Sequence, residues 1–213
     1  MILYSYWRST AAYRVRIALN LKKIDYQYKA VHLVKDGGQH LSDEYKQLNP
    51  HALVPSLLTA DGQVLTQSLA IIDYLEENFP QNSLYPQNSS TKAQAKAMAL
   101  SIACDIHPLN NLRVLKYLKA EDFDQQQLDK WYAHWIHQGF NAIEKNLEKS
   151  AKSYCFADTL SVADIFLVAQ VYNAKRFNIA LQGYPTIQKI NDNCLKQQAF
   201  IDAMPENQVD CDQ

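Results

Sequence analysis

Apolar and polar positions alternate in short runs over the first eighty residues of the chain. The predicted strands occupy residues 2–6, 26–30, 54–59 and 63–66. Helical spacing of the apolar positions predicts helices over 13–21, 41–48 and 69–78. The last two strands flank Asp61-Gly62, which is a strong signal for a hairpin turn. The expected order of elements in this half is therefore βαβαββα.

Pro55 opens the third predicted strand, which completes the pattern of a thioredoxin-like domain. An X-Pro bond at such a place can be cis and leave the backbone of Val54 free to pair with an extended peptide ligand. The alternative is an ordinary proline at the start of a strand, where a missing N–H donor is tolerated. The pattern alone leaves both interpretations open.

The rest of the chain reads almost entirely as helix. Helical patterns run over about 90–118, 125–149, 161–175 and 185–202. Residues 81–90 are polar and turn-rich, as is typical of a linker. We therefore expect a thioredoxin-like domain over 1–80, a linker over 81–90 and an all-helical domain over 91–213.

One helix start in the second half carries two independent signals. Ser161 and Asp164 have the spacing of a capping box, and Leu160 and Ile165 have that of a hydrophobic staple. The sequence therefore predicts that a helix begins at Ser161.

Charge and cysteine content narrow the class of function. Lys and Arg number 21 and Asp and Glu 22, a net charge of −1 that argues against binding to nucleic acid or to an anionic membrane. The four cysteines form no C-x-x-C pair, and His134 and His137 lack a third candidate ligand, so no metal site is expected. No apolar run is long enough to span a membrane, and the opening residues do not resemble a signal peptide. We expect a cytoplasmic protein.

Candidate chemistry gathers at two predicted helix starts. Ser9 and Thr10 precede the first helix, where a hydroxyl close to the helix dipole can stabilise a thiolate. Gln67 and Ser68 lie at a strand-to-helix junction that can hold a carboxylate. Simple helix capping is the alternative at both places, and we expect Ser68 to cap the helix over 69–78 whether or not it also binds a ligand.

The placement of arginine adds a hint about the substrate. Three of the five arginines fall between residues 8 and 16, whereas the sixteen lysines are spread along the chain. Because the guanidinium fork suits carboxylates, a small dianionic substrate is a reasonable expectation.

Taken together, these stretches resemble the zeta class of the cytosolic glutathione transferases over nearly the whole chain. The most specific stretch is 4–19, and further matching stretches are 35–39, 48–50, 54–55, 67–72, 160–165, 174–177 and 184–186. The resemblance implies a thioredoxin-like domain followed by an all-helical domain, glutathione as cofactor and a homodimer.

The resemblance also implies roles for individual residues. The pocket for the glutathione sulfur would comprise Ser9, Thr10, Ala11, Ala12, Tyr13 and Arg14. Of these, Ser9, Thr10 and Arg14 are the expected catalytic residues, and Ser9 is the leading thiolate-stabilising hydroxyl. The other residues expected to contact glutathione are His40, Val54, Pro55, Gln67, Ser68, His107 and Asn111. Arg8, Arg113 and Arg176 would bind the carboxylates of the substrate.

Two departures from the family pattern bear on mechanism and substrate. The family motif commonly reads Ser-Ser-Cys-Ser where this chain has Ser9-Thr10-Ala11-Ala12, so the working thiol would be that of glutathione itself. His40 and His107 stand where animal members tend to carry glutamine, and the run 104–111 looks more like bacterial members, including maleylpyruvate isomerases.

The implied reaction is cis-to-trans isomerisation of a maleyl diketo acid, with the glutathione thiol added and then released. Maleylacetoacetate, which becomes fumarylacetoacetate in tyrosine and phenylalanine catabolism, is the leading substrate and maleylpyruvate the alternative. Two other functions remain open: a general glutathione transferase that conjugates electrophiles, and a non-catalytic binding module with the same fold.

Overall fold

The structure is a computed structural model that describes residues 1–211. The chain forms two compact units, one of Met1–Ser83 together with the segment from Leu195 onward, and one of Leu84–Cys194. We refer to them as the first and second unit and describe each separately. The domain boundaries expected from the sequence, 1–80, 81–90 and 91–213, stay a prediction.

A four-stranded mixed sheet forms the centre of the first unit. Its strands are β1 (Ile2–Ser5), β2 (Gln27–Ala30), β3 (Ser56–Leu58) and β4 (Val64–Thr66). They lie in the order β2-β1-β3-β4, with β1 parallel to β2 and antiparallel to β3. With α1 (Thr10–Lys22), α2 (Asp43–Leu48) and α3 (Ser68–Asn78), the predicted order βαβαββα is confirmed.

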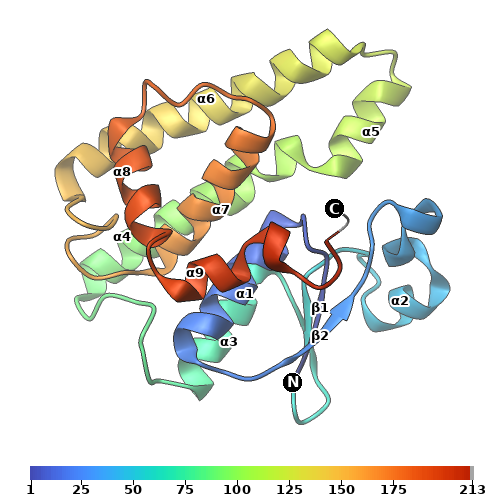
Figure 1. Ribbon diagram of the computed structural model, residues 1–213, viewed down its shortest axis with the longest axis horizontal. Helices are drawn as coiled ribbons and strands as arrows, with labels where there is room; N and C mark the ends of the chain where they lie inside the picture. Colours follow the sequence, from blue (N-terminus) through green and yellow to red (C-terminus); the bar gives the residue numbers. More distant parts are fainter. Residues whose placement is uncertain (212–213) are drawn as a thin grey trace. The chain divides into compact units, whose positions relative to one another are not determined.

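The two faces of the sheet pack against different helices. Leu3 and Leu57 pair across β1 and β3 and are completely buried in the core that contains α1 and α3, which lie side by side (Figure 1). Tyr4, the next residue of β1, points to the opposite face, where it contacts Tyr45 of α2. Successive side chains of a strand point to opposite faces of the sheet. Because Leu3 faces the core with α1 and Tyr4 faces α2, these two helices lie on opposite faces.

The end of the chain returns to the first unit. Helix α9 (Gln198–Ala203) packs along α1, and the 3₁₀ turn η5 (Pro205–Asn207) follows it (Figure 1). The sequence predicted one helix over 185–202. That prediction is wrong because α8 (Pro185–Cys194) ends where the chain leaves the second unit, and α9 belongs to the first.

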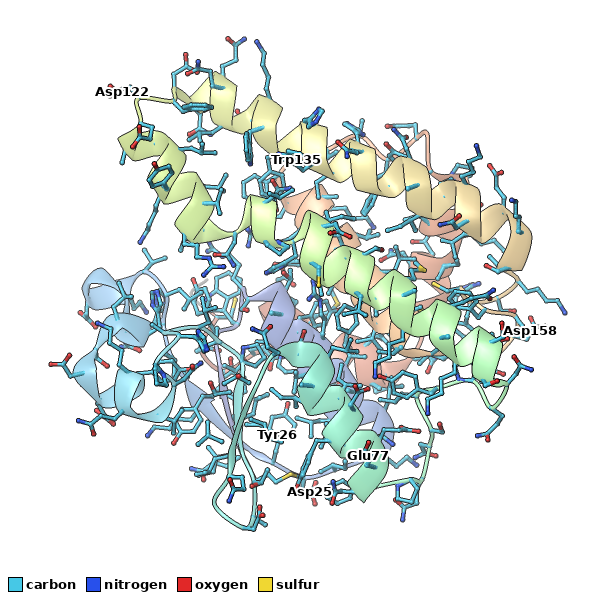
Figure 2. The ribbon with its side chains drawn as sticks, turned by 180° about the vertical axis from the view of Figure 1, so that it is seen from behind. Asp25, Tyr26, Glu77, Asp122, Trp135 and Asp158 are labelled. Atoms are coloured by element: carbon cyan, nitrogen blue, oxygen red, sulfur yellow. The ribbon has the colours of Figure 1, made fainter. Side chains whose placement is uncertain are left out.

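The second unit consists of helices. They are α4 (Ser89–Leu100), α5 (Leu112–Ala120), α6 (Gln125–Ser150), α7 (Val162–Arg176) and α8. The turn between α5 and α6, where Asp122 lies, and α6 itself can be followed in Figure 2. No helix in the described part of the chain is both long and apolar enough to cross a membrane.

The predicted helix over 90–118 is interrupted in the structure. After α4 comes a π-helical segment, η3 (Ser101–Ile106), and then a 3₁₀ turn, η4 (Pro108–Asn110). Pro108 has no N–H to continue a helical ladder, and the N–H of His107 reaches back five residues to the carbonyl of Ile102 at 2.9 Å. Gly139 of α6 allows close packing there, since a Cβ on it would lie 2.1 Å from Cδ1 of Ile106.

The start of α7 has the capping-box contacts that the sequence predicted. The backbone N–H of Ser161 donates to Asp164 Oδ2 at 2.8 Å, and the Ser161 hydroxyl donates to the same oxygen at 3.0 Å. The other oxygen, Oδ1, accepts from the backbone N–H of Cys155 at 2.8 Å. Asp164 is completely buried, and burial raises its pKa against the opposing effect of these hydrogen bonds.

Candidate functional site

Ser9 is the N-cap of α1, which begins at Thr10 and so starts three residues before the predicted helix. Ser9 Oγ accepts from the backbone N–H of Ala12 at 3.2 Å. A hydroxyl that accepts a backbone hydrogen bond still has its own proton to donate. Ser9 can therefore cap the helix and also donate to an anion at its positive end, so the two interpretations of this residue are compatible.

The next residues of α1 turn into the first unit. Thr10 is 2% exposed, and Ala12 and Tyr13 are also buried, whereas Ala11 is half-buried. The phenol of Tyr13 donates to the carbonyl of Phe200 in α9 at 3.5 Å. Any contact of Tyr13 with a ligand would therefore come from its backbone.

Arg14 connects the beginnings of α1 and α3. Its Nη1 donates to the hydroxyl of Ser68 at 3.4 Å, and both side chains are buried. Ser68 was expected to cap α3, but that prediction is wrong, because the N-cap is Gln67 and Ser68 is the first helical residue. Its hydroxyl is instead part of a buried polar pair.

Gln67 has an uncommon backbone conformation. Its φ of 68° is in the left-handed region, and its side chain is exposed just ahead of the first turn of α3. A non-glycine residue held at positive φ stores strain, and such residues gather at functional sites. The position of Gln67 is thus suited to a ligand at the N-terminus of this eleven-residue helix.

The Val54-Pro55 peptide bond is cis, as the first of the two interpretations of Pro55 expected. Val54 is half-buried and Pro55 is buried directly ahead of β3. The expected contact of Val54 with glutathione stays a prediction.

His40 lies in a loop that is organised by a residue the sequence analysis missed. The buried imidazole of His32 accepts at Nδ1 from the backbone N–H groups of Val34 (3.0 Å) and Lys35 (2.8 Å). His32 also donates its own backbone N–H to Oε1 of Gln39 at 2.9 Å. No pattern in the sequence marks this role, since a lone histidine after a strand has no recognisable spacing.

Gly38 is required where this loop turns back toward His40. Its φ is 109°, and a Cβ there would lie 2.6 Å from Cε1 of the His40 ring. His40, half-buried in the 3₁₀ turn η2 (Gln39–Leu41), is thus packed against backbone that only glycine can supply.

A groove of 820 Å³ lies beside this loop, between the sheet and α2. Its wall includes Tyr4, Lys29, Gln39 and Tyr45. It is lined by none of the residues predicted to bind glutathione.

Arg8 is exposed and stacks on its neighbour. Its guanidinium carbon lies 4.3 Å from the centroid of the Trp7 ring, and Trp7 itself is buried. The cation next to Ser9 is therefore supported by a fixed aromatic surface.

The candidate residues of the second unit lie on two of its segments. His107 and Asn111 flank η4, and Arg113 is exposed in the first turn of α5. Asn111 caps α5 by accepting from the backbone N–H of Arg113 at 3.1 Å. Arg176 is exposed at the end of α7, with its guanidinium carbon 4.7 Å from the Phe177 ring centroid.

Two contacts that the sequence analysis missed hold the turn between His107 and Asn111 against α6. The indole N–H of Trp131 donates to the carbonyl of Leu109 at 2.8 Å, and the side-chain amide of Asn110 donates to the carbonyl of Tyr132 at 3.2 Å. In each contact the two residues lie 22 positions apart in the chain. The spacing of residues within one element cannot reveal such contacts.

Two family models match the chain. The N-terminal domain of glutathione S-transferases matches residues 3–83, and their C-terminal domain matches residues 109–200. The chain belongs to the glutathione S-transferase family. The predicted fold, a thioredoxin-like domain followed by a helical one, and the resemblance to zeta-class transferases are both confirmed.

Similar proteins cover the full length of this chain. A probable maleylacetoacetate isomerase of Vibrio cholerae is 49% identical over 99% of this chain and 98% of its own. The holo structure of a maleyl pyruvate isomerase, a bacterial zeta-class transferase, matches with a TM-score of 0.95 and 43% identity over 100% of both chains. A maleylacetoacetate isomerase of Methylobacterium extorquens, with bound malonate and glutathione, has a TM-score of 0.95 and 34% identity, again over 100% of both chains.

Proposed function

We propose that this protein is a glutathione-dependent isomerase that converts maleylacetoacetate to fumarylacetoacetate. The observation that carries the proposal is the full-length similarity to proteins named as isomerases of maleyl diketo acids, one of them with glutathione and a dicarboxylate bound. The geometry of the first unit supports it, since the Ser9 hydroxyl retains a proton to donate at the start of α1.

The residues at the starts of α1 and α3 fit the two ends of glutathione. A thiolate would accept the hydroxyl proton of Ser9 at the positive end of a thirteen-residue helix, with Thr10 beside it. The α-carboxylate of the γ-glutamyl group would lie at Gln67 and Ser68, at the start of α3. Arg14, which contacts Ser68, adds a fixed positive charge between these two positions.

Bound glutathione supplies a thiolate that adds reversibly to the cis double bond of the substrate and leaves once the trans geometry is reached. Ser9 would favour the thiolate over the thiol by donating a hydrogen bond from its hydroxyl to the sulfur. Arg8 in the first unit and Arg113 and Arg176 in the second are the cations that would bind the substrate carboxylates. His40, Val54 and Pro55 would contact the remaining glutathione backbone, and His107 and Asn111 are the candidates for glutathione contacts in the second unit.

The test is the Ser9→Ala variant, assayed with glutathione and maleylacetoacetate. Loss of one hydrogen bond to the developing anion should reduce kcat/KM by roughly 100-fold. Ser42→Ala is the matched control, because Ser42 caps α2 in the same way, accepting from the N–H of Tyr45 at 3.2 Å. An unchanged kcat/KM in S9A would show that the role assigned to Ser9 is wrong.

Maleylpyruvate is the second candidate substrate, favoured by the TM-score of 0.95 to a maleyl pyruvate isomerase. Assay of both acids by loss of the enol absorbance ranks them directly. Conjugation of an aromatic halide without isomerisation of either acid would instead indicate a general transferase. Failure to bind a glutathione resin would indicate a non-catalytic binding module.

We further propose that the protein is a cytoplasmic homodimer acting in tyrosine and phenylalanine breakdown. The second unit exposes apolar side chains along α4 and α5, namely Leu100, Leu112 and Tyr117. Exposed apolar side chains of this kind can be buried in a two-fold interface. The mass in solution from light scattering tests the dimer, and a monomer at working concentration would overturn it.

A further inference from the structure

We propose that Asp210, together with Arg16 and the backbone of Ala203, positions the loop that carries Arg8 and Ser9. The inference rests on the proposed function, because it concerns the residues expected to act on glutathione and substrate. Asp210 lies 201 positions after Ser9 in the chain, and nothing in the sequence pairs the two.

Arg16 joins the loop between β1 and α1 to the end of α9. Its guanidinium is completely buried, and Nε donates to the carbonyl of Ala203 at 3.0 Å. Nη2 donates to the carbonyl of Trp7 at 3.0 Å, and Nη1 donates to the carbonyl of Tyr6 at 3.4 Å and to the hydroxyl of Ser5 at 3.1 Å. A buried cation with this set of acceptors fixes the backbone around it.

Asp210 also binds the backbone of this loop. Its Oδ2 accepts from the backbone N–H of Trp7 at 3.1 Å, while Oδ1 accepts from the hydroxyl of Tyr28 in β2 at 2.6 Å. The N–H and the C=O of Trp7 are therefore both held by charged side chains, Asp210 and Arg16.

Tyr6 and Trp7, whose backbone groups are held in this way, directly contact Ser9 and Arg8, respectively. The carbonyl of Tyr6 accepts the backbone N–H of Ser9 at 2.9 Å as well as the Arg16 guanidinium. The ring of Trp7 carries the guanidinium of Arg8 at 4.3 Å. Since a displacement of about 1 Å can cost about 100-fold in rate, release of Trp7 should affect both Arg8 and Ser9.

Asp210 is thus a positioning residue that acts through Trp7. The Asp210→Ala variant loses both acceptor oxygens, whereas Asp210→Asn keeps one oxygen that can still accept from the Trp7 N–H. Asp202→Ala is the matched control: Asp202 is an exposed carboxylate of α9 whose Oδ1 accepts from the Gln198 side chain at 2.6 Å.

The experiment titrates the thiolate absorbance of the enzyme–glutathione complex and measures kcat and KM for each variant. In D210A the pKa of the bound thiol should rise by about one unit, which is a tenfold decrease in its ionisation constant. We expect kcat to fall in the order wild type, D210N, D210A, while D202A matches wild type. If D210A fails to fold, D210N and Tyr28→Phe replace it, because each alters the hydrogen bond between Tyr28 and Asp210 at one of its two partners.

Equal thiolate titrations and equal kcat in wild type and in folded D210A or D210N would overturn this inference alone. A wild-type protein that forms no bound thiolate and isomerises neither acid would overturn the proposed function and this inference with it. An unchanged thiol pKa with lower unfolding stability in D210A would show a purely structural role and would likewise overturn the inference.

Discussion

The indole N–H of Trp131 donates to the backbone carbonyl of Leu109 at 2.8 Å, and this bond ties α6 to the turn between His107 and Asn111. Trp131 also meets the ring of Trp135, one helical turn later, edge-on at a centroid distance of 5.7 Å. Both indoles are half-buried. Among the residues that the structure describes, the indole N–H of Trp135 has no hydrogen-bond partner, so the two tryptophans differ in one contact that can be isolated.

The Trp131→Phe variant should loosen the turn that carries His107 and Asn111. We expect its free energy of unfolding to fall by about 1 kcal/mol more than that of Trp135→Phe, because only W131F loses a hydrogen bond. If His107 and Asn111 serve glutathione, the KM for glutathione should rise in W131F and stay unchanged in W135F. Urea denaturation and steady-state kinetics measure the two effects, and equal behaviour of the two variants would contradict the prediction.

A buried carboxylate caps α8 from another helix. Glu144 of α6 accepts from the backbone N–H groups of Thr186 at 2.7 Å and Ile187 at 2.9 Å. In Glu144→Gln, one of these N–H groups would face an amide NH₂, so we expect a loss of about 2 kcal/mol in unfolding free energy. Glu148→Gln, exposed on the same helix, is the control and should change stability by less than about 0.5 kcal/mol. A smaller loss in E144Q than in E148Q would rule out this capping role.

Asp164 should give the stability of the protein a definite pH dependence. Burial raises its pKa in the folded state, so the folded protein binds this proton more tightly than the unfolded chain does. The stability linked to this group is fully present below the unfolded pKa of about 3.9 and is lost as the pH rises through the higher folded value.

The stability difference between wild type and Asp164→Asn reports this titration. The excess of the wild-type free energy of unfolding over that of D164N should shrink as the pH rises from the unfolded pKa of Asp164 through its higher folded pKa. The reason is that D164N has no proton to lose at this position. Denaturant unfolding of both proteins at a series of pH values measures the difference. An advantage that grows with rising pH would mean that the hydrogen bonds from Cys155 and Ser161 outweigh desolvation.

The features predicted correctly from sequence depend on residues close together in the chain. The capping box of Ser161 and Asp164 lies within one helical turn, and the hairpin at Asp61-Gly62 within one loop, so spacing alone reveals them. The order of strands and helices in the first unit follows for the same reason. Pro108 carried a signal that was present in the sequence and overlooked, since a proline inside a helical pattern marks an interruption.

The remaining features depend on contacts between distant parts of the chain. Arg16 had been noted only as one of several arginines beside the start of the first helix. Its acceptor at Ala203 is 187 residues away, and no local pattern pairs the two. The expectation that Ser68 caps α3 was wrong because the positive φ of Gln67 shifts the helix start, a conformation that glutamine seldom adopts.

The contact between Arg16 and Ala203 also bears on how the protein is made. During translation Arg16 is made 187 residues before its acceptor in α9. The guanidinium of Arg16 can therefore donate to this carbonyl only after α9 has been synthesised. The first unit thus depends, for the burial of one of its charges, on a segment that is made much later in synthesis.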